Sequence, residues 1–356
     1  MRILVLWADD TSTNLGVRAL AAGTTALAHR VWPGAEVTFQ SFGMRRAELP
    51  LGTFPSMGRE WLTGRRGMRR WLGDFDLVID TRAGDSFSDS YGIRRMGIMT
   101  AVAEAARRSG TPVVLGPQTI GPFDTGRGRI LGRHALGTAT AVIARDSASA
   151  RYASQHGRPV DARSSDVVFA LPPVPRTATR DIVLNVSGLL WEDNPHVDSG
   201  EYRRQVRALH AALTAEGRTV SLLAHVLDSP GADNDVPVAR QLAGEWGAEV
   251  IVPQGLDEVR AVVASARLVI ASRMHACLNA LSVGTPAIPL AYSRKFAPLL
   301  ADLGWTAVVD LRTEPDVGPA VLRLARGATL ADDAAALAER ARGSFAGDEH
   351  ALGVLL

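Results

Sequence analysis

The segment from Leu268 to Tyr292, LVIASRMHACLNALSVGTPAIPLAY, carries the clearest fold signal in the chain. An apolar run over 268–271 ends at a polar stretch, a helical stretch follows over 276–283, and a second apolar run occupies 287–290. Because parallel strands need a crossover connection, usually a helix, this order indicates two parallel strands joined by one helix. The segment therefore predicts one strand–helix–strand unit of a parallel sheet.

The same alternation extends over the rest of the chain. Near-continuous apolar runs are typical of strands that are covered on both faces. Helical stretches, such as 16–30 and 93–109, separate these runs and predict an α/β fold. The predicted strands are 3–7, 36–40, 76–80, 112–115, 141–144, 182–186, 220–224, 250–252, 268–271, 287–290 and 307–310.

A proline-rich stretch over 171–180, LPPVPRTATR, interrupts the alternation and predicts an interdomain linker. A chain of 356 residues is also too long for one compact core. We therefore expect two Rossmann-like domains facing across a cleft, with ligands bound beyond the carboxyl ends of the strands. The predicted boundaries are an N-terminal domain over 1–172, a linker over 173–180, a C-terminal domain over 181–330 and a helical tail over 331–356.

Composition excludes several classes of protein. The 39 basic residues nearly balance the 37 acidic ones, so the chain lacks the basic excess of a nucleic-acid binder. Cys277 is the only cysteine, which excludes an internal disulfide and fits a reducing cytoplasm. No apolar run has the length of a transmembrane helix, so we expect at most peripheral membrane contact. The basic run Arg65–Arg70 is either a solvated loop or helix face, or a surface for phosphate groups or anionic lipid.

The segment Ser272-Arg273-Met274-His275 is the best candidate site. It ends a predicted strand and opens a helix, where free N–H groups and the helix dipole favour anions. The structural alternative is a capping Ser272 with two exposed side chains. Tyr292 and Lys295, which is the only lysine, follow the next strand. We predict an anion site with Arg273 and His275 as catalytic groups and Ser272, Tyr292 and Lys295 as binding groups.

Polar residues at the ends of other predicted strands are further candidates for substrate binding. Each has a structural alternative: helix capping or a plain turn for the loop residues, a salt bridge to Asp146 or Asp166 for the arginine, and a buried structural role for the histidine. These candidates are Asn14, Asp85, Ser86, Gln118, Arg145 and His225.

Taken together, five motifs resemble the polysaccharide pyruvyl transferase family. They are DLVIDTRAGDSFSDSYG, PVVLGPQTIGPF, AVIARDSASARY, SSDVVFAL and LVIASRMHACLNALSVGTPAIPLAYSRKFAPLL. The resemblance runs in order from about residue 3 to residue 303, and its most specific part is the Arg-Met-His segment followed by Tyr-Ser-x-Lys. One loop departs from the family, because a Gly-Gly pair often found there reads Arg82-Ala83-Gly84. We expect the added side chains to narrow the acceptor pocket.

The resemblance implies a fold like that of the B-type glycosyltransferases. It also implies phosphoenolpyruvate as donor, a sugar-containing acceptor and a pyruvate ketal as product; the acceptor classes are small sugars, nucleotide-linked sugars and lipid-linked sugars. No clear metal-ligand cluster appears in the sequence, so we expect no further cofactor to be required. In the family motif, the residues at Arg273 and His275 bind and activate the donor. The alternatives are a glycosyltransferase or other group transferase on the same scaffold, and a non-catalytic family member.

Overall fold

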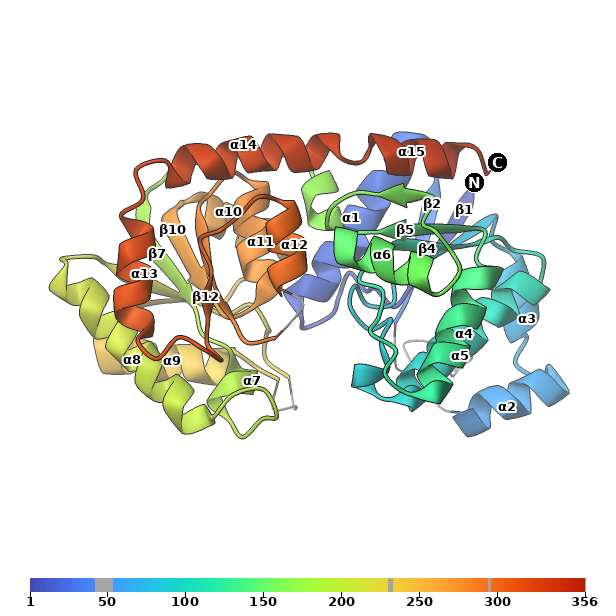
Figure 1. The fold of residues 1–356 in the computed structure, drawn as a ribbon, viewed down its shortest axis with the longest axis horizontal. Helices are drawn as coiled ribbons and strands as arrows, with labels where there is room; N and C mark the ends of the chain where they lie inside the picture. Colours follow the sequence, from blue (N-terminus) through green and yellow to red (C-terminus); the bar gives the residue numbers. More distant parts are fainter. Residues whose placement is uncertain (42–53, 230–232, 294–295, 356) are drawn as a thin grey trace. The chain divides into compact units, whose positions relative to one another are not determined.

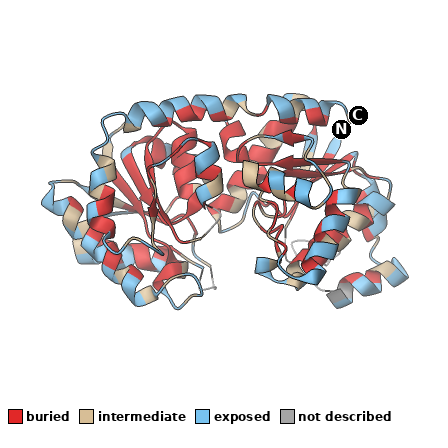
Figure 2. Ribbon diagram, in the orientation of Figure 1, coloured by how far each residue is buried: buried red, intermediate tan, exposed pale blue. Residues whose placement is uncertain are grey.

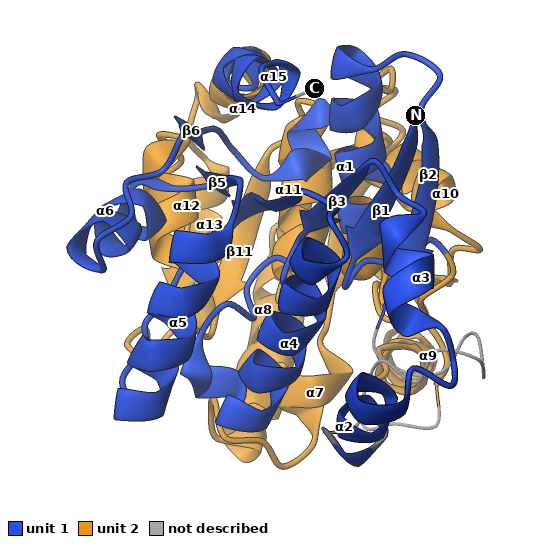
Figure 3. Ribbon diagram, turned by 90° about the vertical axis from the view of Figure 1, so that its right-hand side faces the viewer, with its two compact units in different colours: residues 1–10, 20–170, 343–356 blue, residues 11–19, 171–342 orange. Residues whose placement is uncertain are grey.

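The computed structural model describes residues 1–41, 54–229, 233–293 and 296–355. The chain forms two compact units, coloured separately in Figure 3. Unit 1 consists of Met1–Asp10, Leu20–Ala170 and Gly343–Leu356, and unit 2 consists of Thr11–Ala19 and Leu171–Arg342.

Unit 1 contains a parallel sheet of six strands in the order β2-β1-β3-β4-β5-β6 (Figure 1). The strands are β1 (Arg2–Leu6), β2 (Glu36–Gln40), β3 (Leu77–Asp80), β4 (Val113–Gln118), β5 (Ala141–Ala144) and β6 (Ala162–Arg163). The helices of this part of the chain are α1 (Leu15–Val31), α2 (Phe54–Thr63), α3 (Met68–Gly73), α4 (Ile93–Arg108), α5 (Gly126–Thr138), α6 (Ser147–Gln155) and α15 (Ala346–Gly353), with α1 beginning in unit 2.

Unit 2 repeats this architecture with a six-stranded parallel sheet in the order β12-β11-β10-β7-β8-β9. The strands are β7 (Arg180–Asn185), β8 (Val220–Leu223), β9 (Glu249–Ile251), β10 (Ala266–Ala271), β11 (Ala287–Ala291) and β12 (Val309–Asp310). The helices are α7 (Gly188–Trp191), α8 (Ser199–Ala215), α9 (Val236–Trp246), α10 (Leu256–Ala264), α11 (Met274–Ser282), α12 (Phe296–Asp302), α13 (Val317–Ala325) and α14 (Leu330–Gly343).

The predicted α/β fold is confirmed, and each predicted strand has a counterpart within two residues of its predicted ends, except where β4 extends further and β12 is shorter. Strand β6 was missed because it has only two residues and no apolar run marks it. The chain divides differently from the predicted boundaries at two places. Residues Thr11–Ala19 pack with unit 2, and Gly343–Leu356 pack with unit 1. Both assignments depend on contacts between segments that are far apart in sequence.

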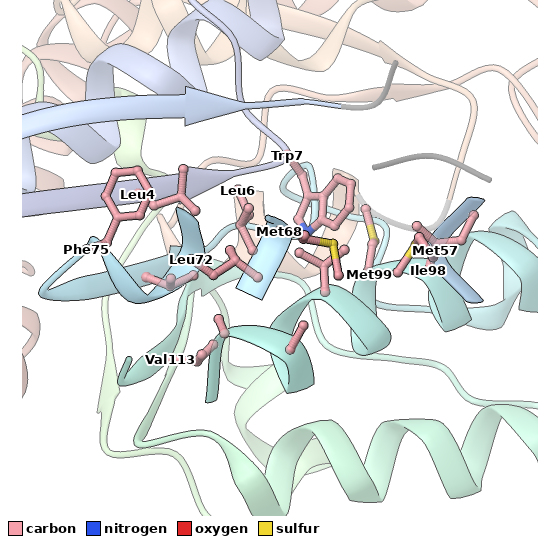
Figure 4. Packing of buried hydrophobic residues seen from close by; sticks show 14 residues of the cluster. Leu4, Leu6, Trp7, Met57, Met68, Leu72, Phe75, Ile98, Met99 and Val113 are labelled. Carbon is pink, nitrogen blue, oxygen red and sulfur yellow. The ribbon is translucent and has the colours of Figure 1, made fainter. Parts of the chain in front are cut away.

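Buried residues concentrate in the two sheets and on the helix faces that cover them (Figure 2). In unit 1, one cluster joins Leu4, Leu6 and Trp7 at β1 to Leu72 of α3 and Met99 of α4 (Figure 4). Burial of each such side chain contributes about 1.5–3 kcal/mol, so the packing of helices on the sheet dominates the stability of the unit. The sheet is thereby a rigid base for the loops at its carboxyl edge.

In the loop after β3, the side chain of Arg82 points inward and not towards a pocket. Arg82, Ala83 and Gly84 have consecutive positive φ angles of 46°, 53° and 80°, a left-handed conformation that favours glycine. The Arg82 guanidinium is fully buried, donates to Asp80 Oδ2 at 2.9 Å and lies 4.7 Å from the centre of the Phe87 ring. The expectation that the Arg82 side chain narrows the acceptor pocket is therefore wrong, because it points into the core of unit 1.

None of the helices in the described residues is long and apolar enough to cross a membrane. The basic run Arg65–Arg70 begins in the loop after α2 and continues into the first turn of α3, and its four arginines are exposed.

Candidate functional site

The predicted site Ser272–His275 follows β10, beside the point where the strand order of the unit 2 sheet reverses. The chain runs from β7 outward through β8 and β9, and then returns to β10 on the other side of β7. Ligand sites in open α/β sheets form at the carboxyl ends of strands beside such a reversal. Asn185 ends β7 and Ser272 follows β10, where Ser272 N donates to Asn185 O at 3.1 Å. The segment Ser272–His275 thus lies where the fold alone predicts a ligand.

A buried carboxylate, Asp235, holds this edge of the sheet together. Its oxygens accept hydrogen bonds from Asn185 Nδ2 at 3.1 Å and from the backbone N–H of Gly188 at 2.9 Å. They also accept from the backbone N–H groups of His225 and Val226 at 3.2 and 3.0 Å. Burial alone would raise the pKa of Asp235, but the charge of Arg273 and these hydrogen bonds outweigh it, and the pKa is lowered. Asp235 is therefore a permanent buried anion.

Arg273 supplies the charge that balances Asp235. Its Nη2 and Nε lie 2.7 and 3.1 Å from Asp235 Oδ1, and Nη2 also pairs with Asp233. Its backbone N–H donates to Asn185 Oδ1 at 3.0 Å, and Arg273, not Ser272, is the N-cap of α11. The residue is 8% exposed, so the structural alternative of an exposed side chain is wrong. The Arg273 guanidinium is held in unit 2 by its carboxylate partners, which the sequence did not reveal.

His275 lies in the first turn of α11, where the N-terminus of α1 packs against it. A Cβ atom at Gly16 would lie 2.9 Å from His275 Nδ1, so only glycine permits this approach. Asn14 Oδ1 accepts from Gly16 N at 2.9 Å, and Leu15 N donates to His225 O at 3.1 Å. The imidazole of His275 therefore sits between the N-terminal ends of two helices, a position that favours an anionic ligand.

His225 lies directly after β8, is buried, and is one of the predicted binding residues. Its Nε2 is 3.4 Å from Asn279 Nδ2, and Asn279 Nδ2 also donates to His275 O at 2.8 Å. Burial lowers the pKa of His225 to about 3, with a further lowering by the neighbouring His275 and Arg273, against the opposing effect of Asp235. His225 is thus neutral near pH 7, and its contact with Asn279 connects the end of β8 with α11.

Ser272 and Tyr292 occupy the two strand ends beside Arg273. Ser272 Oγ lies 2.7 Å from the hydroxyl of Tyr202, which in turn accepts from Ser187 N at 3.0 Å. The ring of Tyr292 lies 5.3 Å from that of His196. Ser272 is fully buried, so its hydroxyl links β10 to α8. The predicted binding residue Lys295 lies outside the described residues.

Four predicted binding residues lie in unit 1 at the carboxyl edge of its sheet. Arg145 Nη1 pairs with Asp166 Oδ2 at 2.8 Å and Arg145 Nε donates to Thr119 Oγ1 at 2.9 Å, so the salt-bridge alternative is what the structure shows. Gln118 ends β4, is fully buried and donates from its side-chain amide to Asp80 O at 3.2 Å.

The other two are Asp85 and Ser86 in the loop after β3. Ser86 is buried, and its hydroxyl lies 3.5 Å from Asp85 Oδ1. Asp85 is only partly buried and accepts from the Tyr91 hydroxyl at 2.8 Å. Of the unit 1 candidates, Asp85 is thus the one whose side chain is not fully buried.

Sequence reasoning missed the residues that orient the site. These are Asp235, Asn185, Tyr202, Asn279 and Gly16, which come from five different segments. The one local signal was Asn185 at the end of an otherwise apolar strand, where a polar side chain is expected to face a site or a buried partner. Within the described residues there is no cluster of His, Cys, Asp and Glu that could hold a metal ion.

Solved structures establish the class of fold. UDP-GlcNAc 2-epimerase from Neisseria meningitidis, bound to UDP-GlcNAc, aligns with a TM-score of 0.60 and 12% identity over 100% of each chain. HepE from Anabaena, in complex with UDP and glucose, aligns with a TM-score of 0.57 and 14% identity over 99% of this chain and 98% of that chain. The fold is therefore that of the B-type glycosyltransferases and UDP-sugar epimerases, as expected.

Sequence comparison narrows this class to one family. The family model for polysaccharide pyruvyl transferase matches residues 42–294. The match spans most of both units, so the chain belongs to the polysaccharide pyruvyl transferase family and is a transferase of that type. No curated protein matches the sequence.

The ion pair between Arg273 and Asp235 predicts a specific pattern of stability losses. Replacing Arg273 with alanine is expected to lower the free energy of unfolding by about 3–5 kcal/mol, because Asp235 is left as a buried, uncompensated charge. Adding Asp235→Ala should recover part of that loss, as the unpaired charge is then removed. Urea unfolding of wild type, both single variants and the double variant gives the coupling free energy between Arg273 and Asp235. Losses that simply add would contradict the pairing.

Burial of neutral His225 predicts a pH dependence of stability. The pKa is 6.5 in the unfolded chain and about 3 in the fold, so between these values the unfolded state binds a proton that the native state does not. The free energy of unfolding should therefore fall as the pH drops from 6.5 towards 3, by up to about 1.4 kcal/mol per pH unit from this residue.

The variant His225→Gln should flatten this dependence in unfolding measurements over roughly pH 4 to 7. His134→Gln is the matched control, since His134 is exposed on α5. Equal slopes for wild type and His225→Gln would show that His225 is not buried as a neutral group.

Proposed function

We propose that the protein transfers a pyruvyl group from phosphoenolpyruvate to hydroxyl groups of a sugar-containing acceptor, forming a pyruvate ketal and releasing phosphate. The observation that carries the proposal is the position of His275 between the N-terminal ends of α1 and α11. This geometry offers an anion site and a proton donor at one point. Membership of the pyruvyl transferase family supports the same chemistry.

The donor is a compact polyanion that carries a carboxylate and a phosphate. The first-turn N–H groups of α11 are suited to one of these groups, since helix N-termini attract anions. Those of α1 already donate to His225 O and to Asn14. The Arg273 guanidinium donates to Asp235. Because Arg273 is the N-cap of α11, this contact fixes the start of the helix and the position of His275. We assign Lys295 to the second anionic group on its place in the sequence, and we keep Arg273 as donor-binding in addition to its role in positioning.

The reaction starts with a proton transfer from His275 to the methylene carbon of phosphoenolpyruvate. The adjacent carbon, C2, then becomes oxocarbenium-like, and an acceptor hydroxyl adds its oxygen to C2 while its proton returns to His275. A second acceptor hydroxyl forms the other C2–O bond. The bond between C2 and the phosphate oxygen breaks, and phosphate leaves with the second hydroxyl's proton. General acid catalysis of this kind contributes about 10²–10⁴-fold in rate.

For the acceptor, the proposal draws on polar residues of unit 1 and on the ligands of proteins with a similar fold. Asp85 and Ser86 are the proposed contacts with sugar hydroxyls, with Gln118 and Arg145 supporting the loop and strand behind them. The similar structures of HepE and of the Neisseria meningitidis epimerase hold UDP or a UDP-sugar. We therefore include nucleotide-linked sugars beside lipid-linked sugars as acceptor classes. No additional cofactor is part of the proposal.

The single cysteine, which is buried, supports a cytoplasmic location for the reaction. Contact with the inner face of the membrane is at most peripheral in this proposal, and the exposed arginines of the run Arg65–Arg70 are one surface that suits it.

The variant His275→Ala tests the proposal directly. It should remain folded and lose about 10²–10⁴-fold in phosphate release from phosphoenolpyruvate in the presence of an acceptor panel, because the proton donor is gone. The panel comprises small sugars, nucleotide sugars and lipid-linked sugars. His134→Ala, an exposed histidine on α5, is the control and should keep the wild-type rate.

Near-wild-type turnover in His275→Ala would refute the assigned role. Thermal stabilisation by a nucleotide sugar, with no shift from phosphoenolpyruvate, would instead favour a glycosyltransferase on the same fold. Tight phosphoenolpyruvate binding without turnover on the whole panel would point to a non-catalytic family member.

A further inference from the structure

Unit 1 carries an apolar groove that the proposed reaction does not use. It lies between the N-terminal halves of α4 and α5, which run side by side in Figures 1 and 3. The groove encloses about 620 Å³, and the side chain of Ile130 on its rim is 70% exposed. We call it the α4–α5 groove; its lining residues are Ile93, Arg94, Gly97, Arg127, Ile130 and Leu131.

Concave and largely apolar clefts are a common form of binding site, whereas single exposed apolar residues are ordinary on protein surfaces. Two facts argue that Ile130 is not simply a stray surface residue. It belongs to a continuous apolar lining with Ile93 and Leu131, and that lining forms a concave surface. The occupant must therefore present apolar groups to the groove.

The charges around the groove identify the chemistry of the occupant. Arg94 stands on α4 and Arg127 on α5, and no acidic residue lines the groove. Helix α5 contains three arginines and no acidic residue, and the one acidic residue of α4, Glu104, already pairs with Arg107 and Arg108. In the part of the chain that the structure describes, Arg94 and Arg127 form no ion pair. The groove is thus apolar at its centre and positively charged at its rim.

We propose that the α4–α5 groove docks unit 1 on the surface of an anionic phospholipid bilayer. In this arrangement Ile130 inserts among the acyl chains near the headgroups, and Arg94 and Arg127 pair with lipid phosphates. Amphipathic surfaces of this composition bind at membrane interfaces through apolar burial together with attraction to anionic lipid. Charge complementarity favours this occupant over an apolar peptide, which would leave both arginines without a partner. The proposal does not depend on the proposed reaction.

The test is co-sedimentation of the full chain with vesicles of two compositions. One is phosphatidylcholine alone, and in the other about a third of the lipid is phosphatidylglycerol. Wild type should bind the anionic vesicles and not the neutral ones, and binding should weaken as salt is raised. The double variant Arg94→Gln, Arg127→Gln should lose about 25-fold in affinity, at about fivefold for each arginine. Ile130→Ser should lose about tenfold through reduced apolar burial.

Matched controls separate the groove from general effects of charge and hydrophobicity. Arg151 on α6 and Arg323 on α13 are exposed and outside the groove, so the double variant Arg151→Gln, Arg323→Gln should change affinity by less than about threefold. Val354, which follows α15, is 68% exposed, and Val354→Ser should bind as wild type does. Thermal unfolding of each variant checks that the fold is retained.

Three outcomes would overturn the proposal. The first is equal binding of wild type to neutral and anionic vesicles, or to neither. The second is equal loss of affinity in the groove variants and their controls. The third is an absence of vesicle binding combined with conversion of a dimer to a monomer by Ile130→Ser in sedimentation velocity, which would assign the groove to a second copy of the chain.

Discussion

The ion pair between Asp235 and Arg273 is the interaction on which the organisation of unit 2 depends. Asp235 is fully buried and gathers N–H donors from the ends of β7 and β8, from the start of α7 and from Arg273. Removing either partner leaves an uncompensated charge, so these elements are coupled at the point where the strand order reverses. The pair fixes the start of α11, and the position of His275 follows from it. A predicted catalytic arginine is thus also a structural one.

This dual role limits what Arg273 contributes to donor binding. Because Arg273 already balances Asp235, it adds little net positive charge for a phosphate and a carboxylate. The helix N-termini beside His275 therefore become more important, as does the glycine that allows them to approach. Gly16 lies in a segment that packs with unit 2 although it is preceded in sequence by a strand of unit 1. The site is assembled from distant segments, which side-chain and backbone contacts hold together.

The sequence predicted the strands well, because apolar runs are local patterns, and the polar residues that follow those runs led to the candidate site. It did not predict the direction of the Arg273 side chain, since its partner Asp235 is 38 residues before it. For Arg145, it offered Asp166, 21 residues further on, only as one of two alternative partners. The inward direction of the Arg82 side chain was missed for a similar reason, because a loop sequence does not show which side chain turns inward. Strand β6 and the assignment of Thr11–Ala19 also depend on long-range contacts.

The central claim is that phosphoenolpyruvate binds beside His275 in unit 2. A crystal structure of the full chain grown with phosphoenolpyruvate tests it most directly. The account predicts the donor at the N-terminal ends of α11 and α1, with its methylene carbon within reach of the His275 imidazole and with the Asp235–Arg273 pair intact. Donor bound elsewhere, with no contact to α11 or to His275, would contradict the account.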